Sequence, residues 1–79
     1  MIKVTIVFRH YTRAESFFKD YYKQKYIEFI SIEGRTITIK TNMEVDIAIY
    51  TKGIFLTLGD NYICFDKKEV TAIRSDYRK

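Results

Sequence analysis

The chain has 79 residues, of which 47% are hydrophobic, with a formal net charge of +4, one cysteine and no proline. This length predicts one domain with a modest core, and the hydrophobic fraction excludes intrinsic disorder. No apolar stretch approaches the roughly 20 residues that span a bilayer, and the early alternation with polar residues argues against a secretory signal. A lone cysteine, Cys64, excludes an internal disulfide and fits a reducing compartment, so we expect a cytoplasmic protein that does not associate with membranes.

The chain begins with a predicted strand and a predicted helix. Residues 2–8 alternate between apolar and polar side chains, which predicts a half-buried strand. The following segment has a 3.6-residue period, which predicts an amphipathic helix over about residues 12–23. Thr12 and Glu15 have the spacing of a capping box at its start. A helix this short is marginal alone, so its apolar stripe must be buried. The stripe consists of Ala14, Phe17, Phe18, Tyr21 and Tyr22.

About five further strands follow, joined by short turns. Residues 26–32 are apolar on both faces, which predicts a central or doubly covered strand. Four later segments alternate, so each has one apolar face directed inward. These segments are 35–41, 44–50, 54–58 and 62–65, with Ile37, Ile39, Val45, Ile47, Ile49, Ile54, Leu56, Leu58, Ile63 and Phe65 inward. Residues 66–69 predict a turn or a short helical turn capped by Asp66. Val70 and Ile73 return to the core, and residues 75–79 are expected to form a frayed basic tail.

This order predicts a single α+β domain over residues 1–79, with the element order β-α-β-β-β-β-β. Short connections between strands favour antiparallel neighbours. We therefore expect an antiparallel meander with the one amphipathic helix packed on its apolar face. Such a ribbon can also curl into a partly open small barrel.

No catalytic or cofactor signature stands out in the sequence. The single histidine, His10, and Cys64 have no spacing that would pair a base with a nucleophile. The three glycines lie in turns between strands, so none opens a helix as a phosphate-binding loop would require. Glu44 and Asp46 project from one strand face, a pattern common on solvated surfaces. We therefore expect a protein that is not an enzyme and uses no cofactor or metal.

Positive charge is concentrated towards the two ends of the sequence. Residues 1–25 carry six bases and two acids, residues 26–66 carry three and six, and residues 67–79 carry five and two. Bases neutralise phosphates and tyrosine can stack on an unpaired base, so we predict a basic lobe that binds nucleic acid or a nucleoprotein. An acidic protein surface and an ordinary solvated face are the alternatives. The lobe comprises Arg9, His10, Tyr11, Arg13, Lys19 and Lys23, with Lys25, Arg74, Arg78 and Lys79 as possible additions.

A second candidate surface is the outward face of the later strands. Tyr50, Phe55 and Tyr62 point away from the predicted core, close to the acidic Glu44 and Asp46. An exposed aromatic cluster marks a partner surface, and the acids favour a protein partner or a homodimer there. The small size and the proline-free, isoleucine- and lysine-rich composition suit an inhibitor or accessory module of phage or mobile-element origin. A homodimeric structural domain is the third hypothesis.

Overall fold

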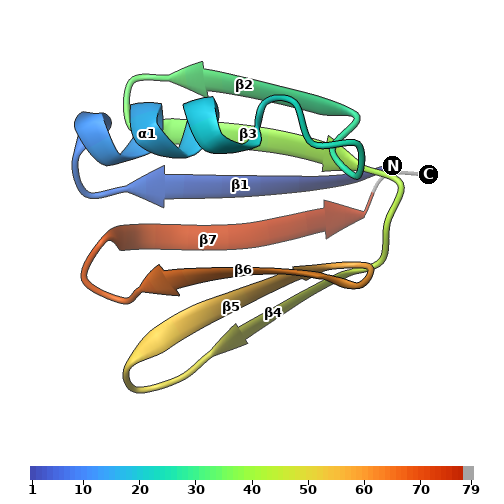
Figure 1. Ribbon diagram of the computed structural model, residues 1–79. Coiled ribbons are helices and arrows are strands. Elements are labelled where there is room, and N and C mark those ends of the chain that lie inside the picture. The colour runs from blue at the N-terminus through green and yellow to red at the C-terminus, as the bar shows by residue number, and fades with distance from the viewer. Residues whose placement is uncertain (78–79) are drawn as a thin grey trace.

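The computed structural model describes residues 1–77, and side chains as far as residue 76, as one helix and seven strands in two antiparallel sheets (Figure 1). The elements are β1 (Ile2–Phe8), α1 (Tyr11–Tyr21), β2 (Phe29–Glu33), β3 (Thr36–Thr41), β4 (Val45–Ile49), β5 (Gly53–Leu58), β6 (Asn61–Asp66) and β7 (Val70–Tyr77). The predicted α+β class, with antiparallel strands and one helix, is confirmed. Within residues 1–77, no helix has the length and hydropathy needed to cross a bilayer.

β1 lies inside the larger sheet, whose strand order is β2-β3-β1-β7. It pairs antiparallel with β3 on one side and with β7 on the other, so that Ile6 lies opposite both Ile37 and Ile73. β3 also pairs antiparallel with β2, so β1 and β2 run parallel with β3 between them, in a split β-α-β unit. The second sheet is the meander β4-β5-β6. The strands thus form two sheets and not one continuous ribbon.

β7 is the largest difference from the sequence prediction. Residues 75–77, predicted to fray, complete a strand that pairs with β1 as far as Ile2 opposite Tyr77. The reason is that β1 has a second edge of backbone donors and acceptors, which β7 satisfies. Residues 78–79 of the predicted tail lie outside the described residues.

α1 begins at Tyr11, so the predicted capping box is wrong. The N-cap residue is His10, whose side chain makes no capping hydrogen bond, and its carbonyl accepts the Ala14 amide at 3.3 Å. The physical cause is a tertiary hydrogen bond: the Arg9 amide donates to the Glu69 carbonyl at 2.8 Å. This bond extends the strand pairing to the residue before the N-cap, and the helix starts directly afterwards.

β2 is an edge strand, although residues 26–32 predict a strand that is central or covered on both sides. Residues 26–28 belong to the connection from α1, and Ile27 is buried there while Phe29 is exposed. Thr41 holds this connection in place. Its fully buried hydroxyl donates to the Tyr26 carbonyl at 2.7 Å and accepts the Met43 amide at 3.0 Å. The two-faced apolar pattern therefore reflects a packed loop followed by a strand.

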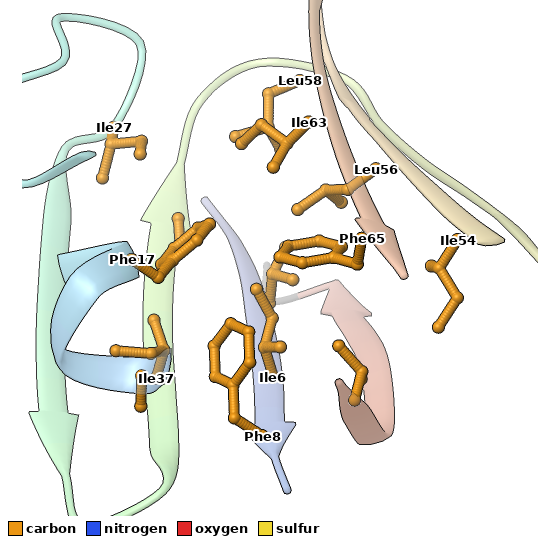
Figure 2. Packing of buried hydrophobic residues seen from close by; sticks show 14 of the residues in the cluster. Ile6, Phe8, Phe17, Ile27, Ile37, Ile54, Leu56, Leu58, Ile63 and Phe65 are labelled. Carbon is orange, nitrogen blue, oxygen red and sulfur yellow. The ribbon is translucent and has the colours of Figure 1, made fainter. Parts of the chain in front are cut away.

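The core lies between α1 and the inner faces of both sheets (Figure 2). Phe17 of α1 packs against Phe8 of β1 and Phe65 of β6, with ring centroids 5.6 Å and 5.5 Å away. The inward prediction is confirmed for Ile37, Ile39, Val45, Ile54, Leu56, Leu58, Ile63 and Phe65, all of which are buried. Ile47 is half-buried and packs against the core, whereas Ile49 is 59% exposed because it is the last residue of an edge strand.

Candidate functional site

Four connections lie together at one end of the molecule. They are β1–α1, β2–β3, β4–β5 and β6–β7, at the left of Figure 1. β1, β2, β4 and β6 all run towards this end, so each chain turn that follows them is placed there. Basic residues from distant parts of the sequence meet at this end as a result. They are Arg9, Arg35, Lys52, Lys67 and Lys68.

An open cleft of about 620 Å³ lies among these connections, and we call it the basic cleft. Its lining combines one residue before α1, two from the β4–β5 turn and three from the end of β6 and the turn that follows. Four of its six lining residues are basic and one is acidic. The lining residues are Arg9, Thr51, Lys52, Asp66, Lys67 and Lys68. The cleft therefore has a strongly positive wall that is drawn from both sheets.

Hydrogen bonds hold the β6–β7 turn against the end of β1. Arg9 Nε donates to the Lys68 carbonyl at 2.8 Å. The Lys68 amide donates to Asp66 Oδ1 at 2.9 Å, so the one acidic group of the cleft is engaged by backbone. Within residues 1–77, the ammonium groups of Lys52, Lys67 and Lys68 have no ion-pair partner. Lys68 is therefore held by its backbone amide and carbonyl, while its ammonium group extends without an ion-pair partner among the described residues.

The structure separates the residues of the predicted basic lobe. Arg9, His10 and Tyr11 lie at the end that carries the basic cleft, and all three are exposed. Lys19 and Lys23 lie towards the other end of α1, and six residues of helix place Lys19 about 9 Å further along the axis than Arg13.

Several of the predicted cations are already engaged. Arg13 Nε lies 2.7 Å from Glu69 Oε2, and its guanidinium lies 5.5 Å from the Phe8 ring centroid. Lys23 places its ammonium 5.3 Å from the Tyr22 ring centroid, and Arg74 pairs with Asp76 at 3.9 Å. Lys25 is exposed in the α1–β2 connection. The remaining two candidates, Arg78 and Lys79, lie outside the described residues.

Sequence reasoning missed Lys52, Lys67 and Lys68. Each lies in a predicted turn. The only sign of a binding role in the sequence was the presence of basic residues in two separate turns. Their convergence with Arg9 depends on the direction of each strand and on how the two sheets face each other, which the local pattern does not contain.

The predicted aromatic face forms one surface in the structure, which we call the aromatic hollow. It is an open depression of about 570 Å³ on the outer face of β4-β5-β6, lined by Asp46, Ala48, Tyr50, Phe55, Thr57 and Tyr62. The strand register explains this: Asp46, Thr57 and Tyr62 form one row across the sheet. Tyr50, Phe55 and Tyr62 are 57%, 41% and 74% exposed. Tyr50 meets Phe55 edge to face, with ring centroids 5.4 Å apart and planes at 73°.

The basic cleft and the aromatic hollow adjoin at the β4–β5 turn. Tyr50 lines the hollow, and the next two residues, Thr51 and Lys52, line the cleft. Acidic side chains lie towards the opposite end of the same sheet, with Glu44 before β4 and Asp46 in its first half. The hollow thus has one end at Tyr50, next to Thr51 and Lys52 of the basic cleft, and an acidic end at Asp46.

The other candidates for chemistry stay apart. His10 is the N-cap residue of α1, and Cys64 is exposed on β6; no hydrogen bond joins them in the part of the chain that the structure describes. Over the same residues, no group of three or more His, Cys, Asp or Glu side chains is arranged to hold a metal ion.

Comparisons with models of protein families, with curated proteins and with solved structures gave no match. The two adjoining surfaces are therefore the basis for a proposed function.

Proposed function

We propose that this protein is a non-enzymatic module that binds nucleic acid through the basic cleft. The observation that carries the proposal is the convergence of Arg9, Lys52, Lys67 and Lys68, from three separate connections, around one cleft. Clustered bases release the counterions condensed on phosphates, which is the main source of affinity for nucleic acid of any sequence. One acid, Asp66, lies among the four bases that line the cleft, so it offsets this attraction only in part.

The cations of the cleft are compatible with a phosphate backbone. Three of the four bases are lysines, whose compact ammonium groups neutralise charge without the fixed two-pronged geometry of arginine with a carboxylate. Arg9 Nε, the one guanidinium nitrogen here with a partner, is committed to the Lys68 carbonyl. A set of lysines on turns suits a ligand whose charges repeat along a chain.

The test is fluorescence anisotropy of labelled oligonucleotides at salt concentrations from about 50 to 200 mM. We expect wild-type affinity to fall steeply with salt, and the variant Lys67→Gln/Lys68→Gln to bind at least about tenfold more weakly at low salt. Its slope of log affinity against log salt should be shallower by about 1 to 2, since each lost phosphate contact removes about 0.7 to 0.9.

The matched control is Lys19→Gln/Lys23→Gln, which removes the same charge from the other end of α1. We expect this control to bind like wild type, with circular dichroism verifying that both variants fold. Absence of binding at low salt, or equal losses in both variants, would contradict the proposal. Tighter binding to polyglutamate than to an oligonucleotide would instead identify an acidic protein as the partner.

A further inference from the structure

We propose that the nucleic acid is single-stranded, with unpaired bases stacked in the aromatic hollow, one on Tyr50 and one on Phe55. This inference rests on the proposed function and adds the strandedness of the ligand and a second contact surface. It starts from continuity along the chain, because Tyr50 lines the hollow while Thr51 and Lys52 line the basic cleft. A strand whose phosphates lie in the cleft therefore has its next bases beside the hollow.

The rings in the hollow are arranged to receive a flat ligand. Tyr50 and Phe55 stand at 73°, so they do not cover each other face to face as two parallel rings would. Both are well exposed, and the hollow, at about 570 Å³, falls within the size range of small-ligand pockets. Stacking on an aromatic side chain is the usual way in which proteins hold unpaired bases without reading sequence.

Duplex nucleic acid cannot use this surface. In a duplex the base faces are stacked on their neighbours, and only base edges reach the grooves. A duplex would contact the lysines of the cleft and leave Tyr50 and Phe55 unused. The hollow therefore gives the protein a preference for single strands that the cleft alone does not supply.

Charge fixes which part of the ligand enters the hollow. Among the described residues, Asp46 is the only charged one that lines it, and a carboxylate repels phosphate. The same carboxylate can accept hydrogen bonds from base amino groups, such as the N4 amino group of cytosine. This segregation places phosphates at the lysine end and bases towards the Asp46 end, beside the exposed ring of Tyr62.

The experiment compares a labelled single strand with its duplex of the same length, at one low salt concentration. We expect the single strand to bind at least about tenfold more tightly. Tyr50→Ala and Phe55→Ala should each weaken single-strand binding by about fivefold to a hundredfold, the range measured for one stacked base. Duplex affinity and the salt slope should stay unchanged, since no phosphate contact is lost. Tyr50→Phe keeps the ring and should bind like wild type.

The matched control is Tyr11→Ala, which removes an exposed ring at the same end of the molecule but outside the hollow. Equal affinity for single strand and duplex would overturn the inference, and so would a loss of single-strand binding in Tyr11→Ala alone. In either case, weaker binding by Lys67→Gln/Lys68→Gln would still support the proposed function. No binding of any oligonucleotide would overturn the proposed function first. A dimer by sedimentation that Phe55→Ala dissociates, with single-strand binding intact, would assign the hollow to a second copy of the chain.

Discussion

The two sheets bury their inner faces in one core but carry different side chains on their outer faces. The outer face of β2-β3-β1-β7 has half-buried residues such as Thr5, Thr38 and Lys40. It also carries one exposed ring, Phe29, with the Lys40 ammonium 5.2 Å from the ring centroid. The outer face of β4-β5-β6 has the exposed rings of Phe55 and Tyr62. In both sheets, buried and exposed side chains alternate along each strand. Burial in the core therefore explains the residues of the inner faces but not those of the outer faces. The difference is that three exposed rings, Tyr50, Phe55 and Tyr62, gather in one hollow on the smaller sheet, and such a cluster is typical of a ligand surface.

The largest effect is expected when a phenylalanine on the inner face of the smaller sheet is replaced and compared with one on its outer face. Phe65 is 3% exposed and contacts Phe8 and Phe17, so Phe65→Ala should lower the free energy of unfolding by about 3–5 kcal/mol. Phe55→Ala, at an exposed position, should lower it by less than about 1 kcal/mol. Urea denaturation followed by circular dichroism measures both. Equal losses would mean that the outer ring is structural and not available to a ligand.

The next test concerns the buried hydroxyl of the larger sheet. Thr41→Val leaves the Tyr26 carbonyl and the Met43 amide without their partner, and should cost about 1–3 kcal/mol of unfolding free energy. Thr38→Val, on the outer face of the same strand, is the control and should be close to neutral. The same urea titration applies, and a neutral Thr41→Val would show that water replaces the lost hydroxyl.

The turn glycines allow the two sheets to be compared directly. Gly34 in the β2–β3 turn and Gly59 in the β5–β6 turn have φ angles of +61° and +62°. Alanine at either position should cost about 1–2 kcal/mol of unfolding free energy, because left-handed backbone crowds a Cβ. Gly59→Ala should cost more, since its Cβ would lie 3.2 Å from Met43 Sδ while Gly34 has open space. Thermal unfolding of both variants tests this order.

A smaller effect is expected at the ion pair between α1 and the β6–β7 turn. The Arg13 and Glu69 side chains are 34% and 38% exposed, so solvent screens their attraction. A double-mutant cycle with Arg13→Gln and Glu69→Gln should give a coupling free energy of about 0.2–1 kcal/mol, shrinking at high salt. A coupling free energy that does not change with salt would contradict a screened charge–charge interaction between Arg13 and Glu69.

The smallest effect is on the alkaline side of the pH range. Burial, together with the nearby Tyr21, raises the pKa of the Tyr26 phenol above its ordinary value. Above about pH 10 the unfolded chain therefore loses this proton more readily than the folded one, and the unfolding free energy falls as pH rises. Tyr26→Phe should show a shallower decline between about pH 9 and 11 in urea titrations. An equal decline in both proteins would contradict the raised pKa.

The sequence pattern predicted correctly which side chains are buried wherever burial depends only on alternation within one strand. The period of two placed Ile37, Leu56 and Phe65 in the core, and it placed Phe55 and Tyr62 outside, because neighbouring side chains on a strand must alternate. The helix stripe placed Phe17 correctly for the same kind of reason. These predictions needed no knowledge of which strands pair.

Features set by distant contacts were not accessible from the sequence. The hydrogen bond from Arg9 to Glu69 overrides the capping box, and β7 forms because β1 offers it a free edge. The basic cleft brings Lys52 and Lys67 close to Arg9, and this proximity follows from the directions of all seven strands, which the sequence pattern does not give. Charge counted along the chain predicted a positive surface but could not place it.

The pairing of β1 with β7 determines how the molecule responds to a mechanical load. Ile2 and Tyr77 are paired at one end of this ladder, and Phe8 and Val70 are paired at its other end. Tension applied through these two residues would peel the strands apart one rung at a time, and would not shear all rungs at once. The protein should therefore open under weak force, and the turns that hold Arg9 and Lys68 would be the last to separate.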